Sequence, residues 1–267
     1  MKEKAMATTR SALNTRELET RVKDMYREVA EHPEKQFHFE TGRALAERLG
    51  YSTDQLDGVP AEAVASFAGV GFYFDLAELR PGDTVVDLGS GSGMDSFVAA
   101  RLVGADGRVV GIDMTDAQLV KAERLAGAVG FGNIEFRKAY IEKLPIADAS
   151  ADVVISNGVI NLSPEKEKVF AEAARVLRPG GRLAIADIVT AVQLPQGVTC
   201  DASLWAACIG GAMQRDDYRA AIEAAGLAVE TVRENDQYRF VSEQARSATT
   251  TYGVRSVSIL ARKPAEN

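Results

Sequence analysis

The chain has 267 residues, of which 46% are hydrophobic and 26% charged, and its formal net charge is −7. This composition is typical of a globular protein with one large core or a core with appended parts. The acidic balance argues against nucleic acid as a partner, because phosphate binding needs a concentrated basic surface. No stretch approaches the roughly 18 consecutive apolar residues of a membrane span, and the start of the chain is polar. We therefore expect a cytoplasmic protein with a small-molecule partner and no membrane segment.

The two cysteines, Cys200 and Cys208, are too few for a disulfide framework of the secreted type. The chain has no CxxC motif, and His32 and His38 lie far from either thiol in the sequence. We therefore expect no metal site.

The first part of the chain predicts helices. Residues 1–13 are expected to be a frayed lead. Apolar positions three and four apart after Asn14 predict an amphipathic helix that ends before Pro33. A second, short helix is expected to close at Gly50. The segment 59–79 predicts a third helix followed by an aromatic, glycine-bearing lead-in.

From residue 83 onward, short β-rich runs alternate with helical stretches. Strands are expected at 83–89, 107–114, 134–141, 151–158 and 181–189, and the helical stretches between them at 94–103, 116–130 and 165–181. This alternation is the signature of a mostly parallel sheet wound on both faces, an α/β fold. The tail predicts two helices within about 201–225 and then two strand-like runs, 227–235 and 254–263, as an antiparallel edge.

The strongest chemical signal is the sequence VVDLGSGSGMD at residues 85–95, where the first predicted strand ends. In a doubly wound sheet the ligand crevice lies beyond the carboxyl ends of the strands, where the first strand turns into its helix. Gly89, Gly91 and Gly93 have no Cβ, so the backbone there can come close to a nucleotide-like ligand. Asp113 ends the second predicted strand, where an acidic side chain can accept hydrogen bonds from both ribose hydroxyls.

The details of this motif favour a cationic ligand over a dinucleotide. The dinucleotide fingerprint has its third glycine one position later, where Met94 stands. Asp87, before the glycines, is a poor neighbour for a pyrophosphate and a good one for a cation. S-adenosylmethionine (SAM) carries an ammonium and a sulfonium and no phosphate. Nicotinamide binding, or a tight turn with no ligand, are the alternatives.

The glycine block resembles the first motif of class I SAM-dependent methyltransferases, and RPGGRLAIAD at 178–187 resembles the turn and fifth strand of that family. The phrases GIDMTDAQLVKAE, YIEKLP, VISNGVINLSPEKEKVFAEAARVLRPGG and LWAACIGGA extend the resemblance to the arsenite methyltransferases, over roughly residues 66–215. The resemblance implies SAM as cofactor, S-adenosylhomocysteine (SAH) as product and a Rossmann-like, doubly wound, mostly parallel sheet. We expect an N-terminal helical cap (1–75), a SAM-binding core (76–190) and a C-terminal part (191–267). The helices and edge strands of the last part would complete the sheet and the acceptor pocket.

The resemblance also implies a set of cofactor contacts. The methionine moiety is expected to lie against Asp87, Gly89, Gly91 and Gly93. The ribose is expected to lie on Asp113.

Further contacts are implied for the adenine and for the reacting centre. Met114 is expected against the adenine, with Ile141 and Glu142 near its edge. Asn157, at the end of the fourth predicted strand, is expected to face the reacting centre. Met114 and Ile141 could instead be plain core residues, and Glu142 a solvated loop charge.

The departures from the family concern its cysteines. Arsenite methyltransferases hold trivalent arsenic by several thiolates, which suit a soft centre. Val70 stands at the first family position and Gly158 at the second; Cys208 alone matches, and Cys200 is additional. We therefore expect an organic small-molecule acceptor, with arsenic(III) methylation through Cys208 as the alternative. Cys208 could also be a small apolar residue in a helix contact.

An acceptor chamber with apolar and aromatic walls is expected where Val70 and Gly158 adjoin the run Phe72, Tyr73, Phe74. Aromatic faces there could hold a cationic or π-rich group near the methyl group. The expected acceptor-pocket residues are Tyr73, Gly158, Trp205 and Cys208. The candidate catalytic residues are Cys208, His38 and Tyr73. His38 could act as a base or be a structural histidine, and the aromatic run could be ordinary packing.

Two classes of function follow from these residues. Methyl transfer from a sulfonium mainly requires alignment of donor and acceptor, so the lack of a catalytic dyad does not argue against an enzyme. A small-molecule methyltransferase would produce SAH. A non-catalytic SAM- or SAH-binding module would bind the nucleotide without turnover, and an NAD-linked oxidoreductase is a more distant alternative.

Overall fold

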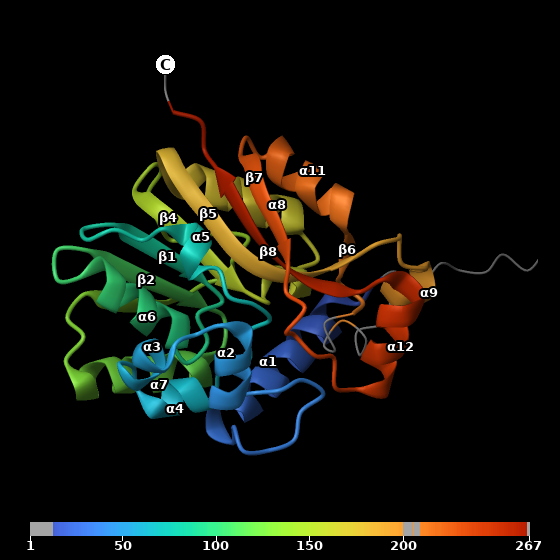
Figure 1. The fold of residues 1–267 in the computed structure, drawn as a ribbon, viewed down its shortest axis with the longest axis horizontal. Coiled ribbons are helices and arrows are strands. Elements are labelled where there is room, and N and C mark those ends of the chain that lie inside the picture. Colours follow the sequence, from blue (N-terminus) through green and yellow to red (C-terminus); the bar gives the residue numbers. More distant parts are fainter. Residues whose placement is uncertain (1–12, 200–204, 206–208, 266–267) are drawn as a thin grey trace, which may run out of the picture.

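The computed structural model describes residues 13–199, 205 and 209–265. Its strands are β1 (Thr84–Leu88), β2 (Arg108–Asp113), β3 (Ile134–Lys138), β4 (Ala151–Asn157), β5 (Leu177–Thr190), β6 (Met213–Gln214), β7 (Ala228–Glu234) and β8 (Arg255–Arg262). Among the described residues these eight strands form one sheet in the order β3-β2-β1-β4-β5-β8-β7, with β6 paired to β5 (Figure 1). The sheet is the frame on which the candidate site is built.

The strands of the sheet are parallel on one side and antiparallel at the other edge. β1 pairs in parallel with β2 and β4, β2 with β3, and β4 with β5. β8 lies antiparallel between β5 and β7. The predicted mostly parallel α/β sheet with an antiparallel edge is therefore confirmed. β5 extends at both ends beyond the predicted 181–189.

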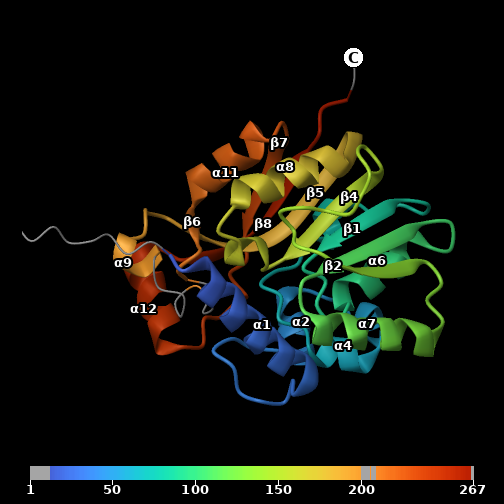
Figure 2. The same ribbon diagram turned by 180° about the vertical axis from the view of Figure 1, so that it is seen from behind.

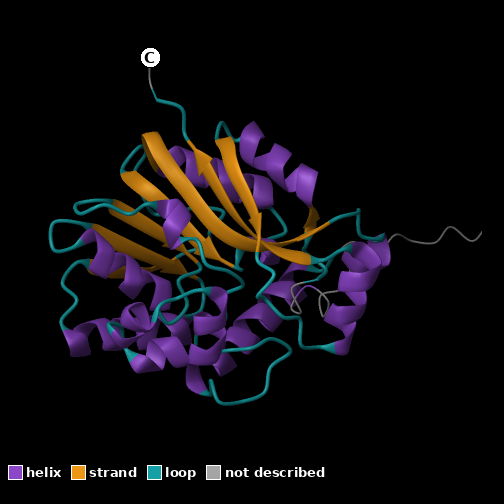
Figure 3. Cartoon of the chain, in the orientation of Figure 1, coloured by secondary structure: helices purple, strands orange, loops and turns teal. Residues whose placement is uncertain are grey.

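Helices cover both faces of the sheet, as Figures 2 and 3 show. These helices are α6 (Met94–Val103), α7 (Asp116–Val129), α8 (Lys166–Val176) and α11 (Arg215–Ala224). Because successive side chains of a strand point to opposite faces, Val85 packs in one hydrophobic cluster and Val86 in the other. The first cluster contains Phe97 of α6, and the second contains Phe170 of α8. The double winding thus follows from strands that are apolar on both sides.

The remaining helices are α1 (Thr15–Glu31), α2 (Arg43–Leu49), α3 (Thr53–Asp57), α4 (Ala61–Ala65), α5 (Phe74–Ala77), α9 (Gln196–Thr199) and α12 (Glu243–Tyr252), with a 3₁₀ turn, η1 (Ile160–Leu162). The predicted helix before Pro33 is α1, and the Asn14 side chain caps it by accepting a hydrogen bond from the Glu17 N–H. The predicted end at Gly50 is also found, because that glycine closes α2 in the left-handed conformation. None of the described helices has the length and apolarity needed to cross a membrane.

Candidate functional site

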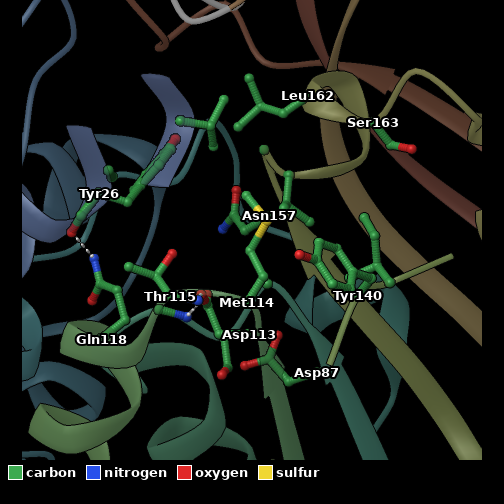
Figure 4. A pocket seen from close by; sticks show the side chains of 18 of the residues that line it. Tyr26, Asp87, Asp113, Met114, Thr115, Gln118, Tyr140, Asn157, Leu162 and Ser163 are labelled. Carbon is green, nitrogen blue, oxygen red and sulfur yellow. Dashed lines mark hydrogen bonds between the residues drawn. The ribbon is translucent and has the colours of Figure 1, made fainter. Parts of the chain in front are cut away.

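A cavity of about 860 Å³ lies at the carboxyl ends of β1, β2 and β4. Its other walls come from α1 and from the segment between β4 and α8. An open α/β sheet is expected to place its ligand there. The volume lies within the roughly 300–1,000 Å³ that is typical of pockets for drug-sized ligands. Figure 4 shows Asp87 and Asp113 at one end and Leu162 at the opposite end.

The glycine turn after β1 has a left-handed backbone at Gly89, Gly91 and Gly93. The Gly91 N–H donates a hydrogen bond to Asp113 Oδ2 at 3.0 Å. A Cβ on Gly89 would lie 2.6 Å from Val159, whereas a Cβ on Gly91 would meet its nearest side-chain neighbour at 3.7 Å. Gly89 and Gly91 line the cavity, and the close approach of a ligand to the backbone there stays a prediction. Gly89 and Gly93 make room for protein side chains, and Gly93 is not among the described residues that line the cavity.

Asp87, at the end of β1, is 2% exposed and lines the cavity. The Ser96 hydroxyl donates to its Oδ2 at 2.6 Å. Burial raises the pKa of Asp87 to about 8, and the nearby charges of Asp95 and Asp113 add to the rise. Asp87 is therefore a carboxyl group whose ionisation a bound cation would favour.

Asp95, in the first turn of α6, also lines the cavity. It accepts hydrogen bonds from Tyr51 (2.6 Å) and Tyr73 (2.7 Å), and the Asn157 amide donates a third at 3.0 Å. Burial raises its pKa, although these hydrogen bonds lower it. Within the described part of the chain, no lysine, arginine or histidine pairs with Asp95 or Asp87. The cavity therefore has an uncompensated acidic end that suits a cationic ligand.

Binding of a cationic ligand beside Asp87 is expected to release close to one proton at pH 7. The carboxyl group, with a pKa of about 8, is mostly protonated in the free protein, and the cation favours its ionised form. Affinity should therefore rise as pH rises through 8 and fall as pH falls below it. Calorimetry with SAM in buffers of different ionisation enthalpy measures this release, and Asp87→Asn should remove it. Heats that do not depend on the buffer would contradict the expectation.

Asp113 lies half-buried at the end of β2, where its oxygens organise the neighbouring backbone (Figure 4). Oδ1 accepts the Thr115 N–H at 2.8 Å, and Oδ2 accepts the Gly91 N–H. The same carboxylate thus joins the end of β2 to the glycine turn of β1. A sugar bound between these two strand ends would lie beside it.

The residues expected to contact adenine, Met114, Ile141 and Glu142, all line the cavity. Ile141 is buried and Glu142 half-buried. The Glu142 carboxylate is not a free loop charge, because it accepts a hydrogen bond from the Ser163 hydroxyl. This contact joins the segment after β3 to the segment after β4 across one wall of the cavity.

Asn157, the last residue of β4, fixes the glycine-bearing lead-in before β1. Its Oδ1 accepts the N–H groups of Val70 at 2.7 Å and Gly71 at 3.3 Å, and its Nδ2 donates to the Gly71 carbonyl at 3.1 Å. Gly158 follows with a left-handed backbone, and a Cβ there would lie 3.2 Å from Val70 Cγ1. The two positions where the resemblance places family cysteines are therefore adjacent in space.

The aromatic run does not form the expected chamber. Tyr73 is fully buried, and none of Phe72, Tyr73 and Phe74 is among the described residues that line the cavity. Phe72 and Phe74 instead pack edge-on against Tyr51, with ring centroids 5.0 and 6.0 Å away. The physical reason is burial: the run closes the core between the N-terminal helices and the sheet.

Two other predicted residues do not line the cavity directly. Trp205 is buried, donates its Nε1–H to the Thr199 carbonyl at 2.7 Å, and has the Lys166 ammonium 4.8 Å from its ring. His38 packs edge-on against Phe39 with ring centroids 4.7 Å apart. Neither is among the described cavity-lining residues. Cys208 lies outside the described residues, as does Cys200. Among the residues that the structure describes, no group of three or more His, Cys, Asp or Glu side chains is placed to hold a metal ion.

α1, part of the expected N-terminal cap, forms a wall of the cavity, a role that no individual residue of this helix had been assigned. Leu18, Val22 and Tyr26 line it, and the Gln118 amide fixes the helix by donating to the Tyr26 carbonyl at 2.8 Å (Figure 4). α1 lies beside the carboxyl ends of the strands in both ribbon views (Figures 1 and 2). Its apolar stripe was the available signal, but a stripe of this kind is equally typical of a helix that only packs on a core.

Comparisons with known proteins agree with this geometry. The family model described as "Methyltransferase domain" matches residues 79–226. The arsenite methyltransferase of Halobacterium salinarum is 42% identical over 229 residues, which cover 85% of this chain and 58% of that protein. The human arsenite methyltransferase is 40% identical over 169 residues, which cover 60% of this chain and 44% of that protein. The chain thus spans about half the length of these curated relatives.

Solved structures show the same architecture. The crystal structure of CrArsM, an arsenic(III) S-adenosylmethionine methyltransferase from Chlamydomonas reinhardtii, has a TM-score of 0.63 and 33% identity, covering 84% of this chain and 74% of that one. A geranyl diphosphate methyltransferase in complex with GPP and sinefungin shares the fold with a TM-score of 0.62 at 20% identity, covering 90% and 99% of the two chains. With its doubly wound sheet, glycine turn and matching family model, the chain belongs to the methyltransferase domain family, and its sequence is that of an arsenite-methyltransferase-like class I SAM-dependent member.

Proposed function

We propose that this chain transfers a methyl group from SAM to a small organic acceptor with an apolar body. The observation that carries the proposal is one cavity with an acidic end, at Asp87 and Asp95, and apolar side chains at the other. SAM carries the methyl group on a positively charged sulfur. Transfer breaks the bond between this sulfur and the methyl carbon and forms a bond from the methyl carbon to the acceptor, and the sulfur becomes the uncharged thioether of SAH. Asp87 and Asp95 would bind the cationic methionine moiety, and Asp113 would accept hydrogen bonds from the ribose hydroxyls.

The protein's part in the transfer is alignment and exclusion of water. The apolar side chains that line the cavity include Leu18 and Val22 of α1, Phe67, and Val159 and Leu162 after β4, and Leu162 lies at the end opposite Asp87 (Figure 4). Burial of an acceptor's apolar body against these side chains would contribute a binding free energy of about 25 cal/mol per Å² of apolar surface removed from water. Gly158 and Asn157 lie between the two ends, so the acceptor's nucleophilic atom would meet the methyl group beside them.

The adjacency of Val70 and Gly158 supports an acceptor other than inorganic arsenite. A soft trivalent arsenic centre is held best by several thiolates, and these two positions would give two converging sulfurs in a chain with cysteines there. Here one side chain is a buried aliphatic group and the other is absent. Capture by three thiolates is therefore not available to this chain, whose two cysteines are Cys200 and Cys208.

A second candidate acceptor is a trivalent arsenical that already carries organic groups. The relatives named arsenite methyltransferases favour it, and so does the match of Cys208 to a family cysteine. Each organic group on arsenic removes one position that a thiolate would have to fill, so one or two cysteines suffice for such a substrate. Inorganic arsenite would remain a poor substrate for the same reason.

A turnover screen decides between these acceptors. SAH formation is measured with purified protein, SAM and three acceptor classes: inorganic arsenite, methylated trivalent arsenicals, and apolar organic nucleophiles. We expect turnover with organic nucleophiles that Cys208→Ser leaves unchanged. Turnover with methylated arsenicals that Cys208→Ser abolishes would establish the second candidate instead. SAM binding without turnover across the panel would contradict both and indicate a non-catalytic binding module.

A further inference from the structure

Four polar side chains meet at the wall of the cavity, and we call them the Asp95 cluster: Tyr51, Tyr73, Asp95 and Asn157. Tyr51 donates to Asp95 Oδ1 and Tyr73 to Asp95 Oδ2. Asn157 Nδ2 donates to Asp95 Oδ2 and, at 3.2 Å, to the Tyr51 hydroxyl. The members come from four separate segments: the residue after the Gly50 cap of α2, the lead-in before α5, the first turn of α6 and the end of β4. Their meeting is a product of the fold, and no local motif links either tyrosine to Asp95.

Within the cluster, Asp95 lines the cavity while the two tyrosines do not. Tyr51 is 3% exposed and Tyr73 is 0% exposed, so their hydroxyls stand behind the carboxylate, away from the ligand space. A tyrosine hydroxyl is a neutral donor and keeps its proton here, because burial and the neighbouring carboxylates raise the pKa of both phenols. Neutral donors orient a carboxylate and leave its negative charge in place, whereas an arginine or lysine would cancel that charge. The negative charge of Asp95 therefore remains available to a cation in the cavity.

We propose that Tyr51 and Tyr73 are positioning residues for the methyl donor: their hydroxyls fix the Asp95 carboxylate at the cavity wall, where it binds the cationic methionine moiety of SAM. The inference rests on the donor site of the proposed function and is independent of the acceptor. In this proposal Asp95 contacts the methyl donor directly, and the two tyrosines affect donor binding only by holding Asp95. A purely structural role, in which the tyrosines only anchor the N-terminal segment, predicts a loss of stability and no change in donor binding.

The test removes one oxygen atom at a time, in Tyr51→Phe and Tyr73→Phe. Both changes keep the ring and its packing. Folded Tyr73→Phe differs from the parent in the hydrogen bond to Asp95 alone, whereas Tyr51→Phe also removes the acceptor of a hydrogen bond from Asn157 Nδ2. Loss of a hydrogen bond to a charged group is expected to raise the Kd for SAM, measured by calorimetry, by about tenfold in each variant. Asp95→Asn, which keeps the shape and removes the charge, should raise it further.

The pH dependence of SAM binding separates the two roles, because it would not change if the tyrosines were only structural. The hydroxyl hydrogen bonds lower the pKa of Asp95, so their loss lets the carboxyl group take up a proton at higher pH. The loss of SAM affinity on acidification should therefore begin at higher pH in both phenylalanine variants. The other carboxyl groups near Asp95 are Asp87 and, beyond it, Asp113, and neither is substituted. Because Asp87 titrates in the wild-type protein as well and its pKa depends on the charge of Asp95, the readout is the shift of the profile between each variant and the wild type.

Tyr218→Phe is the matched control. Tyr218 is also fully buried and donates to a buried carboxylate, Asp187, at 2.7 Å, but it lies on α11, outside the lining of the cavity among the described residues. It should lose comparable thermal stability with an unchanged Kd and pH profile. Wild-type Kd and pH profile in folded Tyr51→Phe and Tyr73→Phe would overturn the inference. Absence of SAM binding by the wild-type protein would instead overturn the proposed function, so the two failures are distinguishable.

Discussion

Asp113→Ala is expected to weaken SAM binding by roughly 100- to 1,000-fold. The carboxylate would accept hydrogen bonds from two ribose hydroxyls, and each hydrogen bond to a charged group contributes about 1.5–3 kcal/mol. The substitution also removes the acceptor for the Gly91 and Thr115 N–H groups, which loosens the glycine turn on which the donor would lie. Calorimetric titration of the purified variant with SAM and with SAH measures the effect, because both ligands carry the same ribose.

Two further variants separate the ribose contact from general effects of charge. Asp113→Asn keeps the size of the side chain and one acceptor oxygen, so its affinity for SAM should lie between those of the wild-type protein and the alanine variant. Asp116→Ala removes a neighbouring acidic residue that is 73% exposed and pairs with Lys138, and it should leave the affinity unchanged. If Asp113→Ala bound SAM as tightly as the parent, the assignment of the ribose to this carboxylate would be wrong.

Gly89→Ala is expected to destabilise the fold by about 2–5 kcal/mol and to weaken SAM binding by more than tenfold. Two costs combine at this position. Gly89 has φ +70°, where an L-residue is strained, and an added Cβ would lie 2.6 Å from Val159. Because Val159 lines the cavity, its displacement changes the ligand space as well as the packing. Thermal unfolding and SAM calorimetry on the same preparation measure the two effects.

Gly82→Ala measures the free-energy cost of the left-handed backbone alone, without a side-chain contact. Gly82 has φ +88°, but no heavy atom lies within 4 Å of where its Cβ would be, so this variant should lose about 1–2 kcal/mol and keep its SAM affinity. Val159→Ala in the Gly89→Ala background should recover part of the lost affinity by relieving the contact. Equal losses of stability in Gly89→Ala and Gly82→Ala would show that the contact with Val159 costs little.

The parallel sheet could be predicted from sequence because its signals are local and repeated. Runs such as the one that forms β1 are apolar on both faces, and each is followed by a helix with its own periodicity. Some helices lacked such signals, and α3 and α12 are two examples. α3 has five residues, too few to show a period, and depends on a capping box between Ser52 and Gln55. α12 is rich in threonine and has only Ala245 and Ala248 buried, so tertiary contact rather than propensity decides it.

Some residues of the candidate site could be predicted from the sequence, and others could not. Asp87 and Asp113 could be placed from sequence, because each ends a strand and the carboxyl ends of parallel strands meet at one edge. Asp95 had a weaker signal, an acid in the first helical turn behind a glycine turn. Tyr51 and Tyr73 had none, since their partner lies 44 and 22 residues away in the sequence. The aromatic run around Tyr73 was misassigned to the acceptor for this reason: composition indicates burial, but not what the ring is buried against.

The contact between positions 70 and 158 makes their side chains interdependent in evolution and in engineering. A cysteine at 158 alone would push its Cβ to 3.2 Å from a valine methyl, on a backbone with φ +78° that disfavours any side chain. Trimming the branched neighbour first leaves room for the second change. Introduction of a sulfur pair at these two positions is therefore expected to cost less stability when position 70 is changed before position 158.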